Sequence, residues 1–262
     1  QSNHYDLLIH PCNYLDPELC DEVVGFIRQT RLDGVILTPP LSDQDDLVSR
    51  LADEKVAFVC IGRGNPGPCI ARVTTNDEDA SCALMKHLVA LGHRAIAFVK
   101  GHPDHQAVQF RELGYRRALA EAGIEVRPEF IVQGYNSFES GLKCAHQLLS
   151  SDKRPTAVFA ANDDMASGVI KAAYELGIQV PSELSVAGFD DVPLAGQVSP
   201  GLTTVRQPIR EMAERAAEIL LSNIGGQAVD KLALCIESEV ILRGSTAPPP
   251  GPQNSQLKLK AV

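Results

Sequence analysis

The sequence has few of the features that mark membrane or secreted proteins. It contains no tryptophan, and only 5% of its 262 residues are aromatic. No apolar run approaches the roughly 20 residues needed to span a bilayer, and the N-terminal segment has neither the basic nor the apolar region of a signal peptide. We therefore expect a cytoplasmic protein that has no membrane partner.

Basic residues are also scarce relative to acidic ones. The chain has 24 Lys and Arg against 33 Asp and Glu, which gives a net charge of -9 and a pI near 5.3. Affinity for nucleic acids depends largely on clustered Lys and Arg. If the protein contacts DNA, we therefore expect a segment outside this 262-residue chain to make the contact.

Cysteine is present, but not in the spacing that metal-binding motifs use. The seven residues are odd in number and include no CxxC pair: Cys12, Cys20, Cys60, Cys69, Cys82, Cys144 and Cys235. Several lie inside apolar runs, which favours reduced, buried thiols over the alternatives of disulfides or a zinc site. Neither a metal nor a cofactor is expected.

The sequence does contain a regular alternation of apolar runs and helical patterns. The expected strands cover residues 5–9, 34–38, 56–61, 95–99, 130–133 and 236–242. The expected helices begin at Pro17, capped by Asp16, and at Ser42 or Asp43, and further ones cover residues 76–91, 110–122, 138–150 and 209–224. This order predicts an α/β protein with parallel sheets and right-handed crossovers.

Residues 62–67 (GRGNPG) formally match the GxGxxG pattern of dinucleotide-binding loops. Such a loop needs a following helix whose N-terminus meets the pyrophosphate. Here Pro66 lies within the run, Pro68 follows it, and then another strand-like run begins. A nucleotide is therefore not the expected ligand.

Residues 156–191 carry the main candidate site, in the order strand, helix, strand. The first apolar run ends at Asn162, and the second ends at Asp190 and Asp191. In open parallel sheets, ligands bind beyond the carboxyl ends of the strands. We expect Asn162 and Asp190 to hold a small polar ligand there, because an amide offers both the donor and the acceptor that a hydroxyl group requires.

The neighbouring carboxylates have alternative interpretations. Asp190 and Asp191 could form an acid/base pair, but adjacent residues leaving a strand usually point apart, so that one faces the ligand and the other caps a loop. Asp163 is interpreted as a helix N-terminal carboxylate that stabilises free N–H groups. No GxSxG elbow, Walker loop or HExxH helix occurs, so an enzyme is not expected.

Three further polar residues precede this stretch. Arg111, in QFRELGY, lies on a helix just after a strand end, where a guanidinium could bind vicinal hydroxyls or a carboxylate. A surface ion pair is the equally simple alternative. His102 and His105, in GHPDH, are attributed to a turn rather than to a metal site, because no third ligand is evident.

Six motifs follow one another along the chain: HLVALGHRAIAFVKG, FRELGY, TAVFAANDDMASGVI, LSVAGFDD, LTTVRQP and VILRGST. Together they resemble the effector-binding module of the lactose-repressor and galactose-repressor family of bacterial transcription regulators. The resemblance covers residues 5–246. It implies two similar doubly wound parallel-sheet subdomains, like those of periplasmic sugar-binding proteins, with a ligand cleft between them.

The resemblance also implies a division of the chain. The first subdomain would hold residues 1–75 and 207–236, and the family's first strand and helix would lie outside this chain. The second subdomain would hold residues 76–206 and 237–247. Residues 248–262, which contain prolines, polar residues and lysines, are expected to form a disordered tail.

Effector-binding positions carry over by resemblance where the motifs align. The clearest matches are Asp190, Asn162 and Arg111, and the weaker ones are His105, Thr75 and Arg63. Two more positions, Asn136 and Phe138, lie just after the expected strand at 130–133. Asn136 stands where relatives often place an aromatic platform, and Phe138 could substitute for that platform.

The function implied by the resemblance is sensing of a small polar effector, a sugar or sugar-like molecule. The module would form a homodimer and allosterically control operator DNA binding by a helix-turn-helix headpiece that is not in this chain. A periplasmic sugar-binding protein of an ABC transporter is the alternative, since it shares the fold. The LTTVRQP and VILRGST motifs favour the regulator.

Overall fold

The computed structural model describes residues 5–62, 68–151, 153–227 and 232–251. The chain divides into two compact units. Unit 1 consists of Gln1–Thr74 and Arg210–Leu234, and unit 2 consists of Thr75–Ile209 and Cys235–Val262. Within the described residues, no helix combines the length and apolar character needed to cross a membrane.

Unit 1 is built on a four-stranded sheet with the strand order β1-β2-β3-β9. The strands are β1 (Val35–Leu37), β2 (Phe58–Ile61), β3 (Ala71–Thr75) and β9 (Leu232–Ile236), and the first three run parallel. The helices are α1 (Leu19–Thr30), the short η1 (Leu41–Asp43), α2 (Asp45–Asp53) and α8 (Ile209–Ile224). Val24 of α1 and Leu47 and Leu51 of α2 are buried in one core with Phe58 of β2.

Residues 5–9, expected as a strand, form no strand in the structure. The sheet order begins at β1, and residues 5–9 take no part in the pairing of the sheet. Leu7 is 84% exposed and Ile9 is 82% exposed. The prediction was wrong because an apolar run becomes a strand only where its backbone N–H and C=O groups find a partner strand.

The first helix also begins later than expected. Helix α1 starts at Leu19 rather than at Pro17. The Oδ1 atom of Asp16 accepts a hydrogen bond from the backbone N–H of Glu18 at 2.9 Å. Asp16 therefore stabilises the turn that precedes the helix, since its side chain reaches a backbone donor two residues on.

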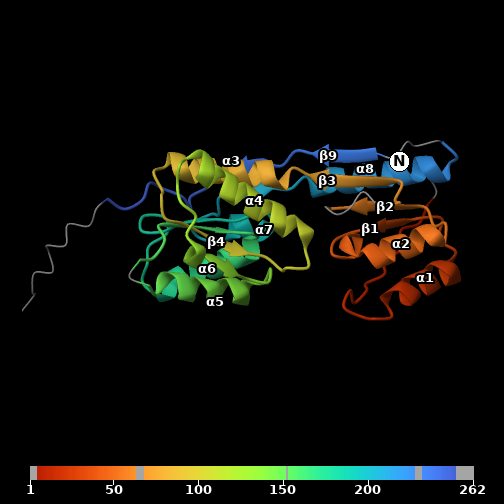
Figure 1. The fold of residues 1–262 in the computed structure, drawn as a ribbon, viewed down its shortest axis with the longest axis horizontal. Coiled ribbons are helices and arrows are strands. Elements are labelled where there is room, and N and C mark those ends of the chain that lie inside the picture. The colour runs from red at the N-terminus through yellow and green to blue at the C-terminus, as the bar shows by residue number, and fades with distance from the viewer. Residues whose placement is uncertain (1–4, 63–67, 152, 228–231, 252–262) are drawn as a thin grey trace, which may run out of the picture. The chain divides into compact units, whose positions relative to one another are not determined.

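Unit 2 contains a parallel sheet with the strand order β5-β4-β6-β7. The strands are β4 (Ile96–Lys100), β5 (Ile131–Gln133), β6 (Ala157–Ala160) and β7 (Ser185–Ala187). The helices are α3 (Asp77–Ala90), α4 (Gln106–Glu121), the short η2 (Pro128–Phe130), α5 (Phe138–Leu149) and α6 (Asp163–Glu175). Helix α3 packs against α4 and α5 packs against α6, and Figure 1 shows these pairs on opposite faces of the sheet.

The central strands of unit 2 are fully buried. Phe98 of β4 and Phe159 of β6 lie with their ring centroids 5.1 Å apart, and neither is exposed. Tyr115 of α4 stacks on Phe98 and donates its hydroxyl hydrogen to the backbone oxygen of Ile96 at 2.9 Å. This contact satisfies the one polar group that the tyrosine brings into the core.

A small second sheet completes unit 2. It pairs β8 (Thr204–Arg206) with β10 (Glu239–Ile241) in antiparallel register, and the short α7 (Pro193–Gln197) precedes it. The bridge between Asp190 and Arg206 places the end of the β7 segment beside β8. The expected strand at 236–242 is therefore present in shortened form, while β9 just before it was not expected.

The predicted tail begins within the described part of the chain. The backbone oxygen of Ala247 accepts hydrogen bonds from Ser185 Oγ at 3.0 Å and lies 2.9 Å from Nε2 of the buried His93. Residues 252–262, the greater part of the predicted tail, lie outside the described residues. Residue 247 is thus held by unit 2 through the side chains of β7 and of the loop before β4.

Candidate functional site

Polar side chains follow three neighbouring strands of the unit 2 sheet at its carboxyl edge. The loop after β4 leads to His105, Asn162 is the second residue after β6, and the segment after β7 ends in Asp190. Because parallel strands end at the same edge, the sequence pattern is enough to bring these three loops together. The edge is the candidate ligand site.

Arg111 and Asp190 form the centre of this site. Nη1 of Arg111 lies 3.3 Å from Oδ1 of Asp190 and donates a hydrogen bond to the backbone oxygen of Ala161 at 2.5 Å. The Arg111 side chain is 9% exposed, whereas that of Asp190 is 25% exposed. The alternative prediction, that Arg111 forms an ion pair on the protein surface, is wrong, because its guanidinium is buried beneath the edge of the sheet.

The guanidinium of Arg111 is fixed by two further groups. Its Cζ atom lies 3.8 Å from the ring centroid of Phe189, a stacking contact that suits a planar cation. Its Nε atom is 3.9 Å from Oδ1 of Asp77, which accepts a hydrogen bond from Thr75 Oγ1 at 3.1 Å. Nε itself is buried and has no hydrogen-bond partner among the described residues. Arg111 therefore keeps donor capacity that these neighbours leave unused.

Asp190 is held in an uncommon backbone conformation. Its φ of 117° lies in the region that favours glycine, and Gln207 Nε2 donates a hydrogen bond to its Oδ1 at 2.6 Å. Burial raises the pKa of Asp190, while the charge of Arg111 and the hydrogen bond from Gln207 act in the opposite direction. Strain of this kind persists where the surroundings fix it, and it is frequent at functional sites.

The adjacent Asp191 points elsewhere, as expected for neighbouring residues that leave a strand. Its carboxylate accepts hydrogen bonds from Arg206 Nε at 2.7 Å and from Arg243 Nη2 at 2.6 Å. Burial alone would raise the pKa of Asp191, but these two hydrogen bonds outweigh it and hold the pKa below its ordinary value. Asp190 and Asp191 therefore serve different partners and do not form a carboxylate pair.

Asn162 has a structural role that the sequence did not assign to it. Its Oδ1 accepts a hydrogen bond from the backbone N–H of Met165 at 3.0 Å, so Asn162 is the N-cap of α6. Its Nδ2 donates to the backbone oxygen of Asn136 at 3.0 Å. One amide hydrogen remains for a ligand, and a ligand contact by Asn162 stays a prediction.

The cap can be separated from other roles by substitution. Asn162→Ala is expected to lower the free energy of unfolding by about 1–2 kcal/mol, because it removes the N-cap acceptor of α6. Asn162→Ser should retain most of the stability, because serine also caps helices. It loses only the contact with Asn136, which the shorter serine side chain cannot reach. Urea unfolding followed by circular dichroism measures both. Equal losses in the two variants would show that the cap contributes little.

Asp163 is not the helix cap that was expected. It is the first residue of α6, but its carboxylate accepts hydrogen bonds from Thr204 Oγ1 at 2.6 Å and from the Val192 N–H at 3.0 Å. Asp163 is fully buried, and burial raises its pKa to about 7. The error arose because the sequence shows which residue begins a helix but not which distant groups pack against it.

The loops after β4 and β5 contact each other through Asn136. Its Oδ1 accepts a hydrogen bond from the His102 N–H at 3.2 Å, and its φ of 61° is left-handed. A side chain at Gly101 would meet this Oδ1 atom at 2.2 Å, so glycine is needed for the contact. Asn136 thus joins two loops of the candidate site.

The remaining predicted residues differ in how the structure places them. His105 precedes α4 and is half-buried, and its pKa is lowered by burial and by the charges of His102 and Arg111. Phe138 begins α5 and is 36% exposed. Arg63 lies outside the described residues. Among the described residues, no contact assigns a ligand role to His105 or Phe138, and the roles of all three residues stay predictions.

Four residues of the site were missed by sequence reasoning. They are Asp77, Phe189, Gln207 and Tyr135, of which the last lies 5.6 Å from the His102 ring. Gln207 belongs to the LTTVRQP motif and Phe189 to the GFDD motif. For Gln207 and Phe189, motif membership was the available signal, but it did not reveal which side chains meet.

Comparison with known proteins gives a match consistent with this geometry. The family described as periplasmic binding protein-like domain matches residues 85–246. The HTH-type transcriptional repressor PurR of Photobacterium profundum is 32% identical over 226 residues, which cover 86% of this chain and 67% of PurR. The HTH-type transcriptional regulator DegA of Bacillus subtilis is 34% identical over 247 residues, which cover 93% of this chain and 72% of DegA.

Solved structures agree with these sequence matches. The complex of the transcriptional regulator CelR with cellobiose has a TM-score of 0.81 at 28% identity, covering 88% of this chain and 71% of CelR. A LacI-family regulatory protein from Chloroflexus aggregans has a TM-score of 0.81 at 30% identity, covering 89% of this chain and 84% of that protein. The chain therefore belongs to the LacI family of transcription regulators and has the periplasmic-binding-protein-like fold of their effector-binding module.

Proposed function

We propose that this chain is the ligand-sensing and dimerisation module of a bacterial transcription regulator. It binds a small polar effector, a sugar or a sugar-like molecule, at the carboxyl edge of the unit 2 sheet. The effector changes the affinity of a helix-turn-helix headpiece for operator DNA through its different affinities for two conformations of the module. The cytoplasmic location and the homodimer belong to the same proposal.

The Arg111–Asp190 pair is the observation that carries the proposal. The guanidinium is stacked on Phe189 and still has an unused buried donor, while the Asp190 carboxylate is partly exposed. A donor and an acceptor 3.3 Å apart match the spacing of neighbouring hydroxyl groups, which both donate and accept hydrogen bonds.

Relatives support a carbohydrate as the first class of ligand to test. CelR was solved in complex with cellobiose. A LacI-family regulator from Enterococcus faecium, with a TM-score of 0.75 at 26% identity, was solved with bound ribose. The two sugars differ in size, so they support the chemical class of the effector and not its identity.

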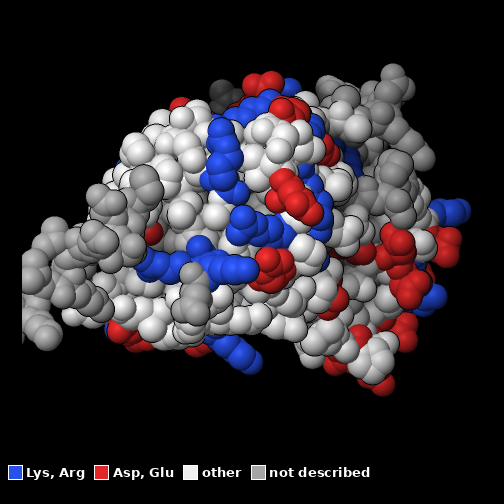
Figure 2. Space-filling model, turned by 60° about the vertical axis from the view of Figure 1, so that its left-hand side comes forward, with Lys and Arg blue, Asp and Glu red and all other residues white. Residues whose placement is uncertain are grey.

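One face of the chain is in keeping with DNA binding by a separate headpiece. On the face that Figure 2 shows, the Lys and Arg side chains of the described residues lie among Asp and Glu side chains and form no continuous basic surface. On α3 and α4, Lys86 is paired with Glu121 and Arg117 with Asp79, each at 2.7 Å. Paired cations are poor ligands for a phosphate backbone, which binds through clustered and uncompensated Lys and Arg.

Calorimetric titration with a sugar panel that includes cellobiose and ribose tests this function. For a sugar that binds the wild-type protein, Asp190→Asn and Arg111→Lys are each expected to weaken binding about 10- to 100-fold, because each removes a hydrogen bond to a charged group. Arg116→Lys is the matched control, since Arg116 lies on the same helix and is 45% exposed.

Two outcomes would contradict the proposed site. Unchanged affinity in both Asp190→Asn and Arg111→Lys would place the ligand elsewhere. A loss of affinity in Arg116→Lys equal to that in Arg111→Lys would show that the effect is not specific to the buried guanidinium. Circular dichroism of each variant establishes that the fold is retained before the affinities are compared.

A further inference from the structure

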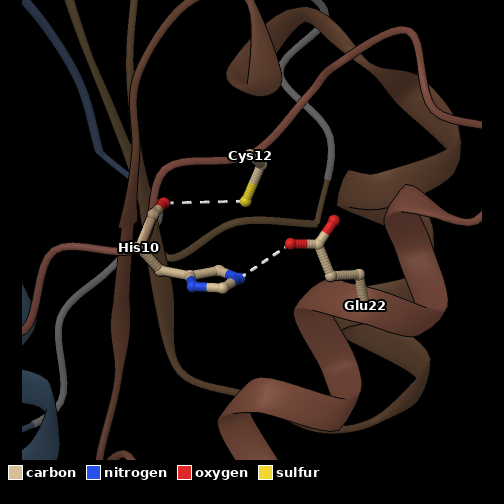
Figure 3. Close-up of side chains that lie close together, drawn as sticks. All are labelled: His10, Cys12 and Glu22. Atoms are coloured by element: carbon tan, nitrogen blue, oxygen red, sulfur yellow. Dashed lines mark hydrogen bonds and ion pairs between the residues drawn. The ribbon is translucent and has the colours of Figure 1, made fainter.

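A cluster of three metal-ligating side chains lies in unit 1, on residues that the effector site does not include. It consists of His10, Cys12 and Glu22. Figure 3 shows the His10 ring and the Cys12 sulfur on the segment before α1, and the Glu22 carboxylate on the first turns of that helix. We refer to these three residues as the His10 cluster.

A turn brings the two parts of the cluster together. The backbone N–H of Asp16 donates a hydrogen bond to the oxygen of Asn13 at 3.0 Å, and the N–H of Leu15 donates to the Asn13 side chain at 3.2 Å. The chain reverses at this turn, so the segment with His10 and Cys12 returns to the N-terminal part of α1. The cluster is thus a product of local folding within unit 1.

The three ligand atoms share one small volume. Nε2 of His10 lies 3.0 Å from Oε1 of Glu22, and one ligand atom from each of the three residues lies within 4.8 Å of the other two. The His10 ring is stacked on Phe26, with ring centroids 4.0 Å apart and planes inclined by 7°. This stacking fixes the direction in which Nε2 points, and Figure 3 shows that direction to be toward Glu22.

We propose that the His10 cluster binds a divalent transition-metal ion, with Zn²⁺ as the preferred ion. Zinc takes imidazole nitrogen, thiolate sulfur and carboxylate oxygen as ligands. With a neutral imidazole, the thiolate and the carboxylate would balance the charge of the ion. Three protein ligands leave one tetrahedral position for water or for a further ligand.

The distances need little adjustment to accept the ion. With Zn–N and Zn–O bonds of about 2.0–2.2 Å and a Zn–S bond of about 2.3 Å, tetrahedral ligand atoms stand about 3.4–3.7 Å apart. The His10–Glu22 contact would open slightly, and the sulfur would move inward. Both Glu22, with 40% of its side chain exposed, and His10, with 30%, leave a path for the ion from solvent.

A simple hydrogen bond between His10 and Glu22 is the competing explanation. It accounts for two of the three residues but gives Cys12 no part. Within the described residues, the hydrogen bond of the Cys12 thiol goes to the His10 backbone oxygen at 3.6 Å, a long contact for a weak donor. The placement of a sulfur within reach of both other ligands is the feature that favours a metal ion.

Calorimetric titration of Zn²⁺ into the tag-free, EDTA-treated and dialysed chain tests the proposal. One ion per chain is expected, with binding at least about tenfold weaker in Cys12→Ser and in Glu22→Gln, since each removes a ligand. Cys20→Ser and Asp21→Asn are the matched controls, because both residues lie on the first turns of α1 outside the cluster. Neither control is expected to change the affinity.

Cobalt substitution supplies a readout that reports the sulfur ligand directly. With Co²⁺, a thiolate charge-transfer band is expected in the wild-type chain and in Cys20→Ser, and it should be absent in Cys12→Ser. The Glu22→Gln side chain keeps its size and can still contact His10, so a loss of binding there does not reflect unfolding. Zn²⁺ binding of equal strength in Cys12→Ser, or a wild-type Co²⁺ complex without the thiolate band, would overturn the proposal.

Discussion

Replacement of Asp163 by asparagine is expected to remove a loss of stability that the wild-type protein undergoes as the pH rises from about 4 to about 7. The Asp163 carboxyl is fully buried, and burial raises its pKa from 3.8 to about 7. In this pH range the unfolded chain carries an ionised Asp163, whereas the folded protein keeps the proton. The shift corresponds to about 4 kcal/mol of free energy of unfolding.

The sign follows from the number of protons that each state binds. Between the unfolded pKa of 3.8 and the folded pKa of about 7, the folded state binds more protons at Asp163, so stability falls as the pH rises. Well above pH 7 both states are ionised and the loss is complete. Asparagine is neutral like the protonated carboxyl and has nearly its size, and its oxygen can accept the hydrogen bond that the Val192 N–H donates to Asp163.

Urea unfolding at a series of pH values measures this effect as a difference between two proteins. The stability of Asp163→Asn relative to wild type is expected to increase by about 3 kcal/mol between pH 4 and pH 7. Taking the difference cancels the other titrating groups. Asp164→Asn is the control, since Asp164 lies in the same first turn of α6 but is exposed. A difference that does not vary with pH would refute the buried proton.

Gly141→Ala is expected to lower the free energy of unfolding by about 3 kcal/mol, because it forces two helices apart. A Cβ atom at Gly141 in α5 would lie 2.3 Å from the backbone oxygen of Met165 and 2.4 Å from its Cα in α6. Gly168 of α6 faces the same contact, where a Cβ would meet the Phe138 oxygen at 2.3 Å. Backbone atoms cannot rotate away, so the helices themselves must move.

Gly196→Ala provides the control for this prediction. Gly196 lies in α7 of the same unit, and an added Cβ there would have no atom within 4 Å. This variant is expected to be at least as stable as wild type, since alanine restricts the unfolded chain more than glycine does. Chemical unfolding followed by circular dichroism compares the three proteins. Equal stability of Gly141→Ala and Gly196→Ala would contradict the close packing of α5 and α6.

Much of the fold could be predicted because its elements are determined by neighbours in the chain. The helix expected at 209–224 coincides with α8, and the helix expected at 138–150 ends within one residue of α5. These patterns depend on periodic apolar residues and on local capping. The expected strand at 5–9 failed because a strand also requires a partner, which local sequence does not specify.

The sequence predicted where the candidate site lies, but not which side chains contact one another there. The run of apolar residues before Asn162 and before Asp190 identified two strand ends, and parallel topology put them at one edge. The helix cap, however, was assigned to Asp163, whereas Asn162 caps α6. Both residues stand at a helix N-terminus, and only the packing of Thr204 and Val192 against Asp163 shows that Asn162 is the cap.

The sequence by itself determined the family, the alternation of strands and helices, and the edge of the sheet where polar residues gather. The tertiary structure alone decided which side chains meet there: Arg111 with Asp190 and Phe189, and Asp163 with Thr204. It also decided that His10, Cys12 and Glu22 meet in unit 1. Periodicity and capping act over a few residues, whereas burial and ion pairing join residues that only the folded chain brings within contact distance.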